Sequence, residues 1–136
     1  DLLADEFDED TAIARLRMNG HLPLGEALMN QQLVAGVGNV YKSEILFMNR
    51  LNPFEPLSNF DEETLRLCLR SARHYMRRNL EGLRRKFRGS TLGDRLWVYR
   101  RQGMPCLECS GPIAMQRQGE TARSTYYCPV CQGTGR

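Results

Sequence analysis

Apolar residues in the first hundred positions recur with the three- and four-residue spacing of amphipathic helices. The pattern predicts helices at residues 8–20, 24–31, 39–50 and 61–82. In the last of these, apolar residues advance in steps of four, three, four and four, at Leu65, Leu69, Ala72, Met76 and Leu80. Asp61 suits the N-cap of this helix, and Gly82 marks its expected end.

After Pro105 the chain has only short apolar runs and is rich in turn residues. Residues 112–116 and 124–127 are predicted to be strands joined by a polar turn around Gly119. We therefore expect a mainly α fold, with a helical domain at residues 1–100 followed by a small β-hairpin domain at residues 101–136.

Charge is divided unevenly along the 136 residues, whose net charge is +3. Residues 1–64 carry twelve acidic and four basic residues, whereas residues 65–136 carry four acidic and fifteen basic ones, fourteen of them arginine. A solvated helix face accounts for any single arginine, but the second half as a whole favours a polyanionic partner.

No run of apolar residues approaches the roughly 18 that would indicate a membrane span. The acidic opening DLLADEFDED lacks the basic start and apolar run of a signal peptide. These features predict a soluble, intracellular protein with no membrane partner.

Four of the five cysteines form two CxxC pairs: Cys106 with Cys109, and Cys128 with Cys131. Eighteen residues separate the pairs, a spacing typical of zinc sites. Four thiolates complete a tetrahedral shell, so we expect one structural zinc ion that supplies folding energy to a hairpin too small for its own core. Disulfides would require an oxidising compartment, and a redox CxxC pair would not need to occur twice.

The fifth cysteine, Cys68, lies on the apolar face of the predicted helix 61–82 and is expected to be a small core residue. A second chemical motif is the glycine-rich turn at Gly36, Gly38 and Asn39, which precedes a predicted helix. Unpaired N–H groups at a helix start suit a phosphate, and Asn39 is expected to cap the helix. A plain interhelical turn would account for these residues equally well.

The stretch LMNQQLVAGVGNVYKSEILFMNRLNP closely resembles the helix–two-turns–helix motif of the formamidopyrimidine-DNA glycosylase / endonuclease VIII family. The four-cysteine hairpin resembles the C-terminal zinc finger of the same family. Together the motifs span nearly the whole chain. The resemblance implies a helical bundle containing this motif, followed by a zinc finger, in a DNA-repair enzyme that removes oxidised bases and nicks the abasic strand.

The resemblance also implies how the chain binds its partner, double-stranded DNA containing an oxidised base or an abasic site. Asn39 matches an asparagine that grips backbone phosphate, and Arg123 matches an arginine that does so from the finger. The glycines match positions where the backbone approaches DNA. The implied DNA contacts are Gly36, Gly38, Asn39, Tyr41, Lys42 and Arg123.

Two departures from the family pattern bear on function, and one further stretch bears on the substrate. The family's catalytic amine and glutamate lie at the extreme N-terminus, whereas this chain begins Asp1-Leu2, so it is expected to be the C-terminal part of an enzyme and inactive alone. Gly25 replaces a basic residue found in many relatives. The short stretch from Gly82 to Trp97 resembles the endonuclease VIII branch, which favours oxidised pyrimidines.

Two other classes of function remain at this stage. A non-catalytic module that binds damaged DNA or the DNA backbone would use the same helices and finger. A zinc-ribbon domain for protein interaction would account for the cysteines, but not for the glycine-rich turn.

Overall fold

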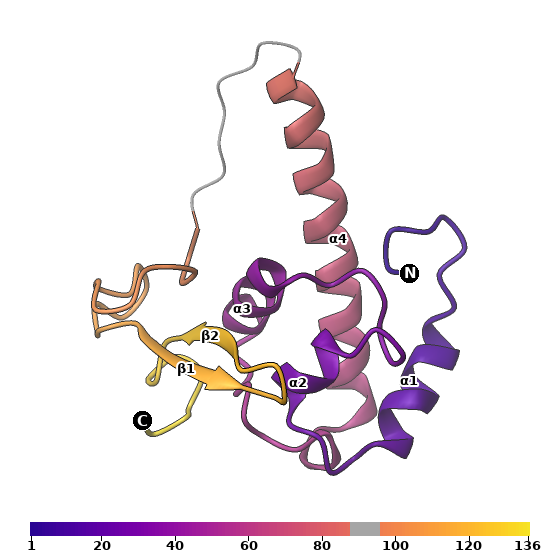
Figure 1. The fold of residues 1–136 in the computed structure, drawn as a ribbon, viewed down its shortest axis with the longest axis horizontal. Helices are drawn as coiled ribbons and strands as arrows, with labels where there is room; N and C mark the ends of the chain where they lie inside the picture. The colour runs from indigo at the N-terminus through magenta and orange to yellow at the C-terminus, as the bar shows by residue number, and fades with distance from the viewer. Residues whose placement is uncertain (88–95) are drawn as a thin grey trace.

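The computed structural model describes residues 1–87 and 96–136. The regular structure of these ranges consists of helices α1 to α4, one short 3-10 helix and a two-stranded hairpin. In Figure 1 the long helix α4 runs between α1 on one side and α2, α3 and the hairpin on the other. The elements are α1 (Glu9–Met18), α2 (Leu24–Met29), α3 (Asn39–Met48), the short 3-10 helix η1 (Leu57–Asn59), α4 (Glu62–Phe87), β1 (Ala114–Gln118) and β2 (Arg123–Tyr127).

The helices share one apolar core to which every helix contributes. Four of the apolar positions predicted for α4 are buried in it, but Leu80 is 37% exposed, so the prediction was wrong at that position. Cys68 is buried in the same core, as predicted. Although α4 has 26 residues, neither it nor any other helix in the described ranges is apolar enough to cross a membrane.

Helix α4 begins as the sequence predicted and ends later. The Asp61 carboxylate accepts a hydrogen bond from the Thr64 N–H at 2.7 Å, which is N-cap geometry. Gly82 does not end the helix, which continues to Phe87. A glycine inside a helix costs only about 1 kcal/mol relative to alanine, and the following LRRKF contains good helix formers.

Helix α3 begins differently from the prediction. Asn39 is its first helical residue, while Gly38 occupies the N-cap position with extended backbone and no side-chain cap. The Gly38 carbonyl accepts the Lys42 N–H at 2.9 Å, so the backbone alone closes the first turn. The expectation that Asn39 caps the helix was therefore wrong, because Asn39 lies one residue after the N-cap position.

The hairpin pairs β1 and β2 antiparallel, with Gln118 opposite Arg123 next to the turn. The first strand lies two residues later than predicted, and the second starts one residue earlier. Arg123 opens β2 and is exposed, as predicted.

The acidic opening of the chain docks on the basic face of α4. Glu9 pairs with Arg66 at 2.8 Å and with Arg70 at 2.7 Å. Further along, Arg73 donates to the Leu2 carbonyl, and Arg77 lies 3.6 Å from the Asp5 carboxylate. Contacts within the molecule thus account for much of the charge asymmetry seen in the sequence, and these arginines already have intramolecular partners.

Candidate functional site

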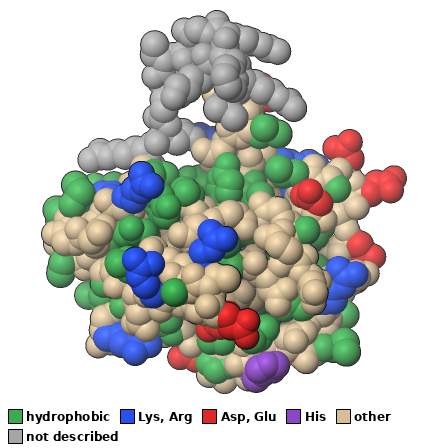
Figure 2. Space-filling view, viewed as in Figure 1, with side chains coloured by type: hydrophobic (Ala, Val, Ile, Leu, Met, Phe, Trp, Pro, Cys, Tyr) green, Lys and Arg blue, Asp and Glu red, His purple; other side chains and the backbone are tan. Residues whose placement is uncertain are grey.

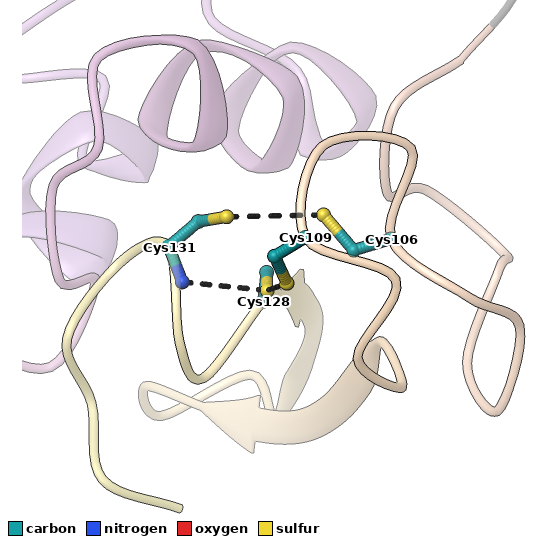
Figure 3. Close-up of side chains that lie close together, drawn as sticks. All are labelled: Cys106, Cys109, Cys128 and Cys131. Atoms are coloured by element: carbon teal, nitrogen blue, oxygen red, sulfur yellow. Dashed lines mark hydrogen bonds between the residues drawn. The ribbon is translucent and has the colours of Figure 1, made fainter.

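The two CxxC pairs converge on one point (Figure 3). All four sulfur atoms lie within 4.8 Å of one another. The sulfurs of Cys106 and Cys131 are 3.9 Å apart, and those of Cys109 and Cys128 are 3.5 Å apart. Four sulfurs bound tetrahedrally at about 2.3 Å from a metal would be separated by about 3.8 Å. Because a disulfide needs about 2.05 Å, these are free thiols arranged as a set that could hold one metal ion.

Backbone N–H groups point at three of these sulfurs. Glu108 donates to Cys106, Gly111 to Cys109 and Cys131 to Cys128, each at 3.4 Å. Burial opposes ionisation of Cys106, but hydrogen bonds from backbone N–H groups and from the Cys128 and Cys109 side chains outweigh it and lower the pKa of this thiol to about 7. Metals bind thiolates, so the lowered pKa of Cys106 favours metal binding at this sulfur. Burial acts in the opposite direction on the second pair, where it raises the pKa of Cys128 and raises that of Cys131 to about 12.

The four-cysteine unit is packed against α3 through a second apolar cluster. Phe47 of α3 stacks on Trp97 with ring centroids 5.4 Å apart, and Val98 and Tyr126 are buried beside it. Gln132 accepts the Cys128 N–H and donates to the Leu51 carbonyl, which follows α3. We call residues 97–136 the finger. Its metal-ligand end is therefore attached to the helical part at several points.

The glycine-rich turn adopts a backbone that requires glycine at one place. Gly36 has φ +101°, a left-handed value that side chains rarely tolerate, and the residue is exposed. Asn39 follows at the first position of α3, and its side-chain oxygen is buried without a hydrogen-bond partner in the described part of the chain. Buried polar atoms without partners are rare in native structures, and an amide oxygen needs a hydrogen-bond donor as its partner.

A cavity of about 280 Å³ lies between α2 and the β1–β2 turn. Its charged and polar lining includes Glu26, Lys42, Gln118, Glu120 and Arg123. The structure thus brings two predicted contacts, Lys42 and Arg123, to the same cavity. Asn39 lies outside this lining, one helical turn before Lys42.

Gly25 borders the same cavity for a steric reason. A Cβ atom there would lie 2.4 Å from the side-chain oxygen of Gln118. That amide is fixed, because it donates to the Pro53 carbonyl and accepts from the Thr125 hydroxyl. The absence of a basic side chain at position 25 leaves room for Gln118, which ties the hairpin to the loop before η1.

Lys42 is far less accessible than the other charged residues of the cavity. Only 1% of it is exposed, and its ammonium donates to the Ser124 carbonyl at 3.3 Å. Burial lowers the pKa of this side chain to about 8, with the nearby charge of Arg123 acting in the same direction and Glu26 opposing it. Tyr41 is half-buried and meets Tyr75 edge-on.

Arg123 is exposed, and the described residues offer it no salt-bridge partner within 4.0 Å. Figure 2 shows lysine and arginine side chains spread over the finger side of the visible face, with acidic side chains gathered chiefly along the N-terminal edge. On this face of the described residues, basic side chains are therefore more frequent near the hairpin than near the N-terminal edge.

Sequence reasoning missed two buried polar residues of α3. Ser43 and Glu44 have no exposed surface, and both accept hydrogen bonds from the finger backbone. The available signal was the polar run Lys42-Ser43-Glu44 inside an otherwise apolar helix. Three adjacent polar residues interrupt the spacing of a helix that is buried on one face.

Comparison with known families gives a match over most of the chain. Residues 1–88 match the family model described as the formamidopyrimidine-DNA glycosylase H2TH domain. Endonuclease 8 2 of Mycobacterium tuberculosis is 38% identical over 133 residues, covering 97% of this chain and 51% of the relative. The chain thus spans about half the length of the curated relatives it matches.

Solved structures show the same architecture. The formamidopyrimidine-DNA glycosylase of Thermus thermophilus superposes with a TM-score of 0.79 at 33% identity, over 98% of this chain and 53% of that one. The Lactococcus lactis enzyme, solved non-covalently bound to DNA containing an AP site, gives 0.78 at 26% identity, over 97% of this chain and 48% of that one.

Proposed function

Because the chain belongs to the formamidopyrimidine-DNA glycosylase / endonuclease VIII family, we propose that it is the DNA-binding part of a DNA glycosylase/AP lyase. Its partner is double-stranded DNA with an oxidised base or an abasic site, inside the cell. In that enzyme, the catalytic amine belongs to a region that is present in the relatives and that this chain does not span. The preferred bases are oxidised pyrimidines, a choice suggested by the short stretch after Gly82, most of which lies outside the described residues.

One observation carries the proposal. Arg123 projects from the strand that packs on α3, and it has no acidic partner among the described residues. At the start of α3, Gly36 and Gly38 place no side chain over the turn, and the first N–H groups of a helix have no partner within the helix. Helix starts and arginine forks both suit phosphate. Such contacts fix the position of DNA without reading its sequence.

A structural zinc ion completes the finger in this proposal. Cys106, Cys109, Cys128 and Cys131 supply four thiolates whose separations fit a tetrahedral shell. Zinc would contribute folding energy to the hairpin and would leave no open position for catalysis. The role of the finger residues is then to hold Arg123 at the end of a rigid hairpin.

In the parent enzyme, the damaged base is flipped out of the duplex and the amine forms a Schiff base with the deoxyribose. The residues of this chain contribute to that reaction by holding phosphates near the flipped nucleotide. Gly36, Gly38 and Asn39 contact the phosphates from the α3 turn, and Arg123 contacts them from the finger. Tyr41 and Lys42 follow Asn39 in the first turn of α3.

The test is a fluorescence-anisotropy titration of this chain with matched duplexes, one undamaged and one carrying a tetrahydrofuran abasic-site analogue. We expect tighter binding to the abasic duplex and an affinity that falls linearly with salt on a log–log scale, as counterion release requires. Equal affinity for the two duplexes would favour one form of the alternative, a non-catalytic module that binds the DNA backbone and does not distinguish damaged DNA. Affinity independent of salt would contradict both hypotheses.

A further inference from the structure

Three consecutive polar side chains of α3 are buried: Lys42, Ser43 and Glu44. Successive residues of a helix point about 100° apart, so three of them cover about 200° of the helix circumference. Since all three are buried, other parts of the molecule cover more than half of the helix at this point. Each of the three side chains forms hydrogen bonds with the backbone of the finger. We call these residues the polar segment 42–44.

Lys42 and Ser43 contact the outer edge of β2. The Lys42 ammonium donates to the Ser124 carbonyl, and the Tyr126 N–H donates to the Ser43 hydroxyl at 3.1 Å. In a two-stranded hairpin, alternate residues turn their backbone groups away from the partner strand. An edge left in this state has unpaired donors and acceptors. Here α3 satisfies two of them, one on each side of Thr125.

Glu44 contacts the start of the finger. Its carboxylate accepts three successive backbone N–H groups, from Trp97 at 2.7 Å, Val98 at 2.9 Å and Tyr99 at 3.1 Å. Glu44 is completely buried, so water does not compete for these bonds. One side chain thereby fixes the backbone of three residues where the chain enters the finger.

A metal ion would hold the two cysteine pairs to each other, but it would not orient the finger relative to the helices. The apolar cluster of Phe47, Val98 and Tyr126 holds the two parts together without strong directional preference. Hydrogen bonds are directional. Gln118 and Gln132 of the finger each donate one to a carbonyl of the helical part, and those of the polar segment reach both the entry of the finger and the strand that begins with Arg123.

We propose that the polar segment 42–44 consists of positioning residues for Arg123: it holds the finger so that Arg123 and the α3 turn bind the same DNA strand together. This inference rests on the proposed function and adds which residues set the position of Arg123. Preorganisation of this kind raises affinity by removing the cost of ordering the finger when DNA binds.

The experiment is a double-mutant cycle on DNA affinity. Ser43→Ala and Glu44→Gln are each introduced into the unaltered chain and into Arg123→Ala, with exposed Glu6→Gln as the matched control. In the unaltered background, each of the two changes in the polar segment is expected to weaken binding about 5-fold or more, the usual effect of one lost hydrogen bond. In the Arg123→Ala background the loss is expected to fall below about 2-fold, because coupled residues are not additive.

A separate readout shows that the intended bonds are lost. The amide resonances of Tyr126 in Ser43→Ala and of Val98 in Glu44→Gln are expected to move, while metal content and the resonances of α1 and α4 stay unchanged. Ser43→Ala is the milder change, so it keeps the test decisive if Glu44→Gln unfolds the finger.

Equal losses in both backgrounds would overturn the inference, since the segment would then act independently of Arg123. Unchanged affinity with the Tyr126 resonance displaced would overturn it as well. Failure of the proposed function looks different: the unaltered chain would not bind DNA, or Arg123→Ala alone would have no effect.

Discussion

Replacing Cys128 by serine is expected to abolish metal binding and unfold the finger while the helical core stays folded. Cys128 is fully buried and its sulfur lies 3.5 Å from that of Cys109. The two-stranded hairpin is too small to be stable alone. Zinc binding to finger peptides supplies about 10–16 kcal/mol at neutral pH. Atomic emission should give about one zinc per unaltered chain and almost none per variant chain.

Cys68→Ala is the matched control for this change. Cys68 is equally buried but lies in the helical core, away from the other four cysteines. Its replacement should lower helical stability by about 1 kcal/mol and leave the zinc content unchanged. Amide resonances of residues 114–127 would report the finger directly. A Cys128→Ser variant with a dispersed, native-like hairpin spectrum and no metal would show that the finger folds without zinc, contrary to this expectation.

Arg123→Ala is expected to give the largest loss of DNA affinity among the exposed residues of the hairpin. Its guanidinium has no salt-bridge partner in the described ranges, so its charge is available for a phosphate. Removing one phosphate contact should weaken binding about 10-fold at low salt and reduce the log–log salt slope by about 1. Anisotropy titrations at several salt concentrations measure both quantities.

Arg117→Ala provides the comparison within the same hairpin. Arg117 is exposed on β1, and its position opposite Ser124 places it on the other face from Arg123. Both variants remove one positive charge, so a general electrostatic effect would lower the two affinities equally. A clearly smaller loss for Arg117→Ala is expected. Equal losses would remove Arg123 from its assigned role.

Features set by short stretches of sequence were predictable. The CxxC spacing identified the four cysteines that the fold brings within 4.8 Å of one another. The Asp61 N-cap needed only Thr64 three residues later. In both cases the partners are close in sequence or follow a fixed spacing.

Features that depend on partners far along the chain were not predictable in the same way. Nothing near Glu44 in sequence indicates that it binds backbone groups 53 to 55 residues later. The docking of the acidic opening on α4 likewise joins Glu9 to Arg70, 61 residues away. The sequence showed the opposite charges of the two halves, but only the fold shows that acidic residues of the opening pair with arginines of α4.

Joint binding of one DNA strand by the α3 turn and the finger is best tested by NMR. Amide and arginine side-chain resonances of the chain are followed during titration with a duplex carrying an abasic-site analogue. If both elements hold the same strand, the resonances of residues 36–39 and of the Arg123 side chain move together and saturate at the same DNA concentration. Shifts confined to one of the two elements, or centred on the arginines of α4, would contradict joint binding.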